Sequence, residues 1–83
     1  MSRILIIDDS PTIRAALAAQ VGIMKFDALM AETGEEGVAV FTKERPSLVL
    51  LDVNMPGIDG YETARRLRSV RPEEWVPIIF LSA

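Results

Sequence analysis

Four side chains that carry oxygen atoms stand at the ends of short apolar runs in the sequence. They are Asp8, Asp9, Asp52 and Ser82. If the runs are parallel strands of one sheet, their carboxyl ends lie at the same edge, and open α/β sheets bind ligands in the crevice at that edge. If the first and third runs are also neighbours in the sheet, the three carboxylates converge in one crevice with the hydroxyl at the same edge, although a long stretch of sequence separates the first two aspartates from the third.

Three carboxylates in one crevice would repel one another and raise one another's pKa values. A hard divalent cation relieves that repulsion, and Mg²⁺ suits such a site because it keeps several waters and substrate oxygens in its shell. We therefore expect Mg²⁺ as the cofactor. A metal beside an aspartate at a strand end suits phosphoryl transfer, in which the carboxylate is the covalent nucleophile and the product is an aspartyl phosphate.

The apolar runs are the candidate strands that would position these groups. They cover residues 4–7, 28–31, 48–51 and 78–81. The runs are continuous rather than alternating, which is typical of strands in a parallel sheet that helices cover on both faces. Each connection is longer than the roughly dozen residues that a parallel crossover needs. The predicted fold class is α/β, a doubly wound parallel sheet with the element order β-α-β-α-β-α-β.

Helix signals fill the three connections. In the first, Ser10 can cap a helix that has Pro11 at its first position, and Gly22 is expected to end it. In the second and third, capping-box spacing predicts helices after Thr33 and Asp59. The predicted apolar stripes are Ile13, Ala16, Leu17 and Val21 in the first helix, Val38 and Phe41 in the second, and Tyr61, Ala64 and Leu67 in the third.

The amino-acid composition limits the classes of protein to which the chain can belong. The chain has 83 residues and a formal charge of −3, so we expect one domain or part of one, and the acidic balance argues against nucleic-acid binding through this segment. The sequence contains no Cys and no His, which excludes disulfides, thiolate chemistry and imidazole ligands. No apolar segment approaches the ~20 residues that span a bilayer, so we expect a cytoplasmic protein without membrane contact.

Three motifs carry a resemblance to a known family. They are Ile6-Ile7-Asp8-Asp9-Ser10, then Leu51-Asp52-Val53-Asn54-Met55-Pro56-Gly57-Ile58-Asp59-Gly60, then Leu81-Ser82-Ala83. In their order and spacing the sequence resembles the receiver domain of bacterial two-component response regulators. The resemblance implies a flavodoxin-like fold with strand order 2-1-3-4-5. It also implies a phosphorylation switch, rather than a turnover enzyme, that receives a phosphoryl group from a sensor histidine kinase or a phosphotransfer protein.

The resemblance also implies a role for each site residue. Asp52 matches the phosphoacceptor. Asp8 and Asp9 match the acidic pair that positions Mg²⁺, and Asn54 matches the position that gives a backbone carbonyl to the metal. Ser82 matches the switch hydroxyl, which moves toward the phosphoryl oxygens.

The family's fifth strand with its lysine, and its last two helices, have no counterpart in these residues. We therefore expect residues 1–83 to be the N-terminal part of a receiver domain with an incomplete sheet. The fourth strand would then have an exposed edge, through which a homodimer or strand exchange is a further expectation.

Two rival functions stay open. A haloacid-dehalogenase-type phosphatase places two aspartates around one intervening residue, a pattern that Asp52-Val53-Asn54 lacks. The other rival is a receiver-like interaction fragment that neither binds metal nor accepts phosphate. Simpler roles also stay open for single residues: Asn54 as a turn residue, Asp59 as a helix cap and Ser82 as a strand-end hydroxyl. We expect packing roles for Met24, Met30 and Trp75.

Overall fold

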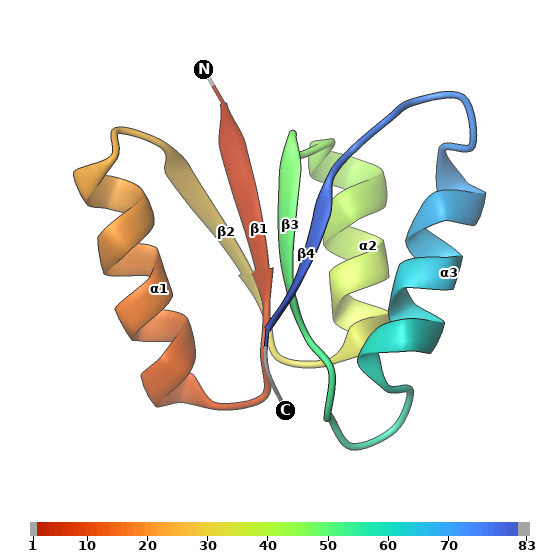
Figure 1. Cartoon of the computed structure of the whole chain (residues 1–83), viewed down its shortest axis with the longest axis horizontal. Helices are drawn as coiled ribbons and strands as arrows, with labels where there is room; N and C mark the ends of the chain where they lie inside the picture. Colours follow the sequence, from red (N-terminus) through yellow and green to blue (C-terminus); the bar gives the residue numbers. More distant parts are fainter. Residues whose placement is uncertain (1, 82–83) are drawn as a thin grey trace.

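Strands and helices alternate along the chain, as the apolar runs predict. The computed structural model describes residues 2–81 (Figure 1). The elements are β1 (Arg3–Ile7), α1 (Pro11–Ile23), β2 (Asp27–Ala31), α2 (Gly34–Glu44), β3 (Leu48–Asp52), α3 (Gly60–Val70) and β4 (Ile78–Leu81). All neighbouring strands pair in parallel, in the order β2-β1-β3-β4. The predicted α/β class and element order are confirmed.

Helices cover both faces of the sheet, α1 on one face and α2 with α3 on the other (Figure 1). This follows from the strand order, because the chain leaves β1 toward β2 on one side and leaves β3 toward β4 on the opposite side. The first and third connections therefore run on opposite faces. At such a switch point the loops diverge and leave a crevice at the carboxyl ends of the two strands. Here the switch point lies between β1 and β3.

Two buried clusters fill the spaces between the sheet and its helices. The cluster on the α2 and α3 side consists of Leu5, Ile7, Ala31, Phe41, Val49, Leu51, Met55, Ala64 and Leu67. The cluster on the α1 side consists of Ile4, Ile6 and Val21, with half-buried neighbours such as Leu17 and Leu50. Successive residues of β1 and β3 therefore alternate between the two clusters, as side chains of a strand do.

All three helices begin where the capping signals predict. Each cap side chain accepts a hydrogen bond from the amide three residues later, which satisfies a donor that the helix itself leaves unpaired. The pairs are Ser10 with Ile13 at 3.3 Å, Thr33 with Glu36 at 3.0 Å and Asp59 with Glu62 at 2.9 Å. Pro11 occupies the first position of α1, as predicted.

The predicted end of α1 at Gly22 is wrong. The helix continues to Ile23, and Lys25 adopts the left-handed backbone with a φ of 70°. The Lys25 amide donates to the Gly22 carbonyl at 3.0 Å, and the Phe26 amide donates to the Val21 carbonyl at 3.1 Å. These two bonds form a Schellman ending, in which the residue after the cap needs a positive φ. A lysine occupies the position that usually favours glycine.

Several side chains that the sequence predicts to pack are exposed instead. Ile13, Ala16, Met24, Met30, Tyr61 and Trp75 all face solvent. Trp75 lies in the loop before β4 and is 83% exposed. On α1, only the side of the helix that carries Leu17 and Val21 meets the sheet, so the predicted stripe is wider than the contact. Within residues 2–81, no helix has the length and apolar character that crossing a lipid bilayer requires.

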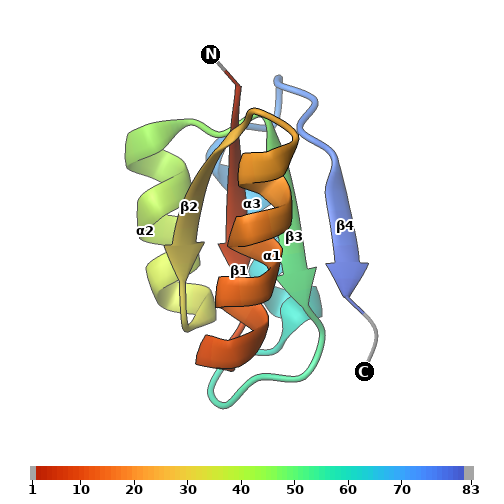
Figure 2. The same cartoon turned by 90° about the vertical axis from the view of Figure 1, so that its left-hand side faces the viewer.

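β4 lies at one end of the sheet, beyond the area that α1 covers (Figure 2). Its Ile79 pairs in register with Leu50 and faces the α1 side, where it is 51% exposed. Its Phe80 faces the opposite side, is 41% exposed and lies 5.2 Å from the ring of Tyr61. Both faces of this strand therefore present apolar surface.

Candidate functional site

The carboxyl ends of β1 and β3 bring three aspartates together. Asp8 and Asp9 follow Ile7, the last residue of β1, and Asp52 is the last residue of β3. Because Ile7 pairs with Leu51 in the parallel register, the next residues along the two strands are neighbours. One carboxylate oxygen from each aspartate lies within 4.8 Å of the others. We call these three residues the acidic cluster.

Asp8 is the most firmly held member of the acidic cluster. It is 5% exposed, and its Oδ1 accepts a hydrogen bond from the Ser10 amide at 2.8 Å. Its own amide donates to the Ala31 carbonyl of β2 at 3.1 Å. Its carbonyl accepts a hydrogen bond from Nη1 of Arg14 at 2.7 Å. Asp9, the next residue, is exposed. The cluster thus combines a fixed buried carboxylate with an accessible one.

Asp52 lies half-buried between these two groups and the loop that follows β3. Burial, which disfavours the charged form, is the main cause that raises the pKa of Asp52 above its ordinary value, and the nearby carboxylates of Asp8 and Asp9 raise it further. The backbone amide of Asn54 donates a hydrogen bond to Oδ1 of Asp52 at 3.3 Å, which lowers the pKa of Asp52 and so opposes this rise. A cation shared by the three carboxylates would remove the like-charge part of this penalty.

The loop after β3 is fitted closely against the backbone of Asp52. A Cβ atom at Gly60 would collide with the Asp52 carbonyl oxygen and would lie only 2.8 Å from the Val53 Cα. Gly60 also donates its amide to the Val53 carbonyl at 2.8 Å. Glycine at this position therefore lets α3 begin directly beside the strand end that carries Asp52. In the same loop, Gly57 takes a positive φ of 80°.

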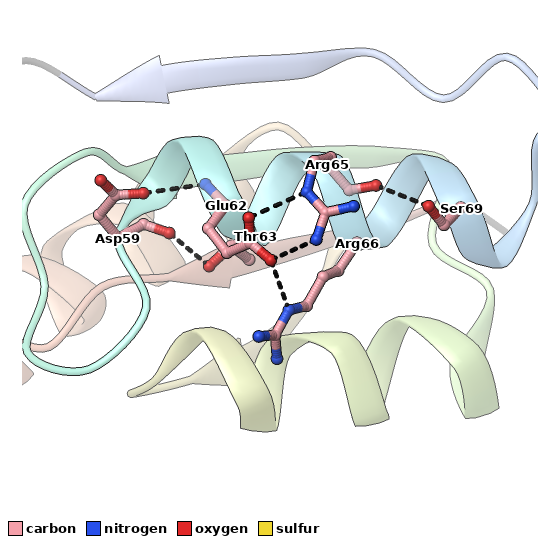
Figure 3. Close-up of polar contacts among 6 residues, drawn as sticks. All are labelled: Asp59, Glu62, Thr63, Arg65, Arg66 and Ser69. Carbon is pink, nitrogen blue, oxygen red and sulfur yellow. Dashed lines mark hydrogen bonds and ion pairs between the residues drawn. The ribbon is translucent and has the colours of Figure 1, made fainter.

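Asp59 contributes to the start of α3 (Figure 3) and is not one of the three residues of the acidic cluster. Its side chain caps the Glu62 amide, and its carbonyl accepts a hydrogen bond from the Thr63 hydroxyl at 2.7 Å. Glu62 in turn accepts hydrogen bonds from Arg65 at 2.6 and 2.9 Å and from Arg66 at 2.9 Å. These hydrogen bonds lower the pKa of Glu62 to about 2. The helix-cap interpretation of Asp59 is confirmed.

The structure thus brings together three of the five predicted site residues. Asn54 is exposed two residues beyond Asp52, and its backbone amide donates a hydrogen bond to Oδ1 of Asp52. Ser82 lies outside the described residues. The residue before it, Leu81, pairs in register with Asp52.

Sequence reasoning missed one residue that shapes this edge of the sheet, Arg14. Arg14 lies four residues after the helix cap Ser10, and residues at this spacing share a helix face, so the spacing places Arg14 near the turn without indicating its contact with the Asp8 carbonyl. Gly60 belongs to the second motif of the resemblance, in which Asp59-Gly60 matches the loop that shapes the site, but the motif did not indicate its close contact with the backbone of Asp52.

Comparison with known proteins decides the family. A family model described as "Response regulator receiver domain" matches residues 4–83. The chain belongs to the response regulator receiver domain family. The resemblance inferred from the three motifs is therefore confirmed, and the phosphatase alternative is set aside.

This receiver domain is similar to both curated proteins and solved structures. It is 46% identical over 98% of its length to "Probable transcriptional regulator ycf27" of Pyropia yezoensis, of which it covers 32%. It matches chemotaxis protein CheY4 of Vibrio cholerae with a TM-score of 0.91 and 29% identity, covering 96% of this chain and 67% of that one. A crystal structure of histidine kinase ThkA in complex with response regulator protein TrrA matches with a TM-score of 0.89 and 38% identity, covering all of this chain and 70% of that one.

The receiver domain spans about a third of the length of the first curated relatives it matches. As a member of this family it is a signalling domain of two-component systems with a flavodoxin-like fold. Its acidic cluster provides the kind of acidic pocket in which receiver domains typically bind Mg²⁺.

Proposed function

We propose that this receiver domain accepts a phosphoryl group on Asp52 from a sensor histidine kinase or a phosphotransfer protein. The observation that carries the proposal is the acidic cluster, whose carboxylate oxygens lie within 4.8 Å of one another at the switch point of the sheet. A kinase donor is supported by the similarity to the ThkA–TrrA complex, in which a histidine kinase is bound to a response regulator protein.

The donor atoms of the site fit Mg²⁺. Three carboxylates converge, and hard oxygen ligands are those that Mg²⁺ prefers. The proposed ligands are the carboxylates of Asp8, Asp9 and Asp52 and the backbone carbonyl of Asn54. When bound, the cation supplies positive charge that neutralises the phosphoryl oxygens. The chain contributes pre-organisation, because the Ser10 amide already fixes the Asp8 carboxylate.

Asp52 is the proposed nucleophile. One of its carboxylate oxygens forms a bond to phosphorus while the bond from phosphorus to the histidine nitrogen of the donor breaks, which leaves an aspartyl phosphate. The backbone amide of Asn54 orients the Asp52 carboxylate through its hydrogen bond to Oδ1. Ser82 is the proposed switch hydroxyl, since it follows Leu81, the register partner of Asp52. New contacts to the phosphoryl group would then shift an existing equilibrium between two arrangements of the domain.

We also propose that residues 1–83 correspond to the N-terminal part of a receiver domain. The support is that the chain covers 67% and 70% of the chains in the two similar structures.

Intact-mass measurement after incubation with a small-molecule phosphodonor and Mg²⁺ tests the phosphorylation proposal. We expect a gain of one phosphoryl group that disappears with EDTA and in Asp52→Asn. Asp59→Asn is the matched control, because asparagine keeps the helix cap and Asp59 lies outside the acidic cluster. Labelling that persists in Asp52→Asn, or that is absent from the unchanged protein, would contradict the proposal.

A second candidate function is an interaction or oligomerisation module, which the exposed Ile79 and Phe80 of β4 favour. Edge strands with apolar side chains tend to pair with other chains. Sedimentation over a range of concentrations tests this function. A concentration-dependent dimer that Ile79→Ser abolishes would support it, and a monomer at all concentrations would contradict it.

A further inference from the structure

A side chain of α1 reaches back over the turn that carries two members of the acidic cluster. The Arg14 amide donates to the Ser10 carbonyl at 3.0 Å, so the backbone of Arg14 belongs to the first turns of the helix. Its half-buried side chain extends in the opposite direction along the chain and donates from Nη1 to the Asp8 carbonyl at 2.7 Å. The contact closes the turn between β1 and α1.

The carbonyl that Arg14 holds is part of the peptide unit that links Asp8 to Asp9. A peptide unit is planar, so fixing its oxygen restricts the orientation of the backbone on both sides of it. Asp8 has two other restraints, from the Ser10 amide and the Ala31 carbonyl. The Arg14 contact therefore acts on the direction of both carboxylates relative to Asp52.

The acceptor atom is also significant for the charge of the site. Arg14 contacts a backbone carbonyl, and within residues 2–81 none of the ion pairs involves a carboxylate of the acidic cluster. An arginine paired directly with Asp8 would compete with a cation for its oxygens. The observed geometry instead leaves those oxygens to a cation, while a permanently charged guanidinium stands at the adjacent peptide group.

We propose that Arg14 is a positioning residue of the acidic cluster, which holds the Asp8–Asp9 peptide and thereby sets the affinity of the cluster for a divalent cation. The inference rests on the proposed function of the same site. It assigns Arg14 no contact with the metal or the phosphoryl group.

Isothermal titration of the protein with Mg²⁺ tests the inference through binding rather than phosphorylation. Arg14→Met removes both the donor and the charge while keeping an unbranched side chain, and we expect about tenfold weaker binding, the size of effect typical for groups that support metal ligands. Arg14→Lys keeps a charged donor and should recover most of the affinity. Arg65→Met is the matched control, because Arg65 lies on α3 and contacts Glu62. The Mg²⁺ affinity of this variant should equal that of the unchanged protein.

A role in folding alone would give a different result. In that case, Arg14→Met would lower the free energy of unfolding in urea and would leave the Mg²⁺ affinity of the folded protein unchanged. The amide NMR signals of Asp9 and Ser10 provide a second readout, because both should shift in Arg14→Met before any metal is added. Equal affinities of Arg14→Met and the unchanged protein would overturn this inference alone. Absence of Mg²⁺ binding by the unchanged protein would overturn the metal part of the proposed function and this inference with it.

Discussion

The two faces of the sheet belong to the same strands and yet are packed to different degrees. Among residues 2–81, nine buried residues form one cluster on the face covered by α2 and α3, whereas three do so beneath α1. Leu50 and Leu51 illustrate the contrast, because these identical neighbours on β3 are half-buried on the α1 face and fully buried on the other. The difference shows that the covering helices, rather than the apolar character of the strand, determine how far each side chain is buried.

How closely each helix packs against the sheet explains much of this difference in burial. α2 carries Gly37 where it meets β1, and a Cβ atom there would collide with the Ile7 side chain. On α1, a Cβ atom at Gly22 would meet nothing within 4 Å. Two glycines in two helices therefore have different roles: Gly37 permits close packing, and Gly22 does not contribute to packing.

The largest expected effect comes from shortening the two leucines of β3. Leu51→Ala should lower the free energy of unfolding by about 2–5 kcal/mol, because it leaves a cavity in a closed core. Leu50→Ala should cost about 1–2 kcal/mol, because part of that side chain is already in water. Urea unfolding of both variants measures the difference. Equal losses would show that the two faces contribute alike.

Substitution of the two glycines should change stability in opposite directions. Alanine favours a helix over glycine by up to about 1 kcal/mol, so Gly22→Ala should stabilise the protein. Gly37→Ala gains the same helix propensity, but its added methyl group crowds the Ile7 side chain, which costs about 1–3 kcal/mol. Ile7→Val in the Gly37→Ala background should recover part of that cost, since it removes the nearest methyl group. Thermal unfolding of the four proteins measures these terms, and a stabilising Gly37→Ala would contradict the close packing of α2.

A smaller gain is expected at the end of α1. Lys25 has a φ of 70°, which strains any residue with a Cβ atom, so Lys25→Gly should raise the free energy of unfolding by about 1 kcal/mol. The control is Lys25→Ala, which keeps the Cβ atom and should give no such gain. Chemical denaturation compares the two. A gain from Lys25→Ala as well would mean that the charge of the lysine, and not its backbone, is the cause.

The smallest expected effect lies on the outer surface of α3 and depends on pH. The pKa of Glu62 is lowered from an ordinary value of 4.5 to about 2 by Arg65 and Arg66. The stabilisation from these ion pairs is therefore fully present above pH 4.5 and is lost as the pH falls toward 2. Between those limits, the stability of Glu62→Gln should depend less on pH than that of the unchanged protein. High salt should reduce the difference, because the pairs are exposed; a salt-independent difference would point to another cause.

The sequence was sufficient for the parts of the fold that depend on local chemistry. Ser10, Thr33 and Asp59 were correct caps because a cap bonds an amide only three residues away. The convergence of the acidic cluster was predictable only together with the strand order that the family resemblance implies, because parallel strands place their carboxyl ends at one edge but the apolar runs do not say which strands are neighbours. The roles proposed for Asn54 and Ser82 stay predictions.

Other features depended on contacts that periodicity does not encode. Ile13 and Tyr61 belong to apolar stripes, but whether a stripe is buried depends on what lies opposite it. The end of α1 at Ile23 depended on Lys25 taking a left-handed backbone that its residue type does not favour. The contact of Arg14 with Asp8 joins a helix to the preceding turn through a side chain with many rotamers, and sequence spacing alone does not select one of them.

The pairing of β1 with β3 has a consequence for the order of folding. The elements α1, β2 and α2 separate these two central strands in the sequence, so their pairing must close a long loop, and such non-local contacts are slow to form. Asp52 meets Asp8 and Asp9 in the same step. A cation that requires all three carboxylates would therefore find its site only once the central pair is in register, and it would prolong the lifetime of the folded state without accelerating folding.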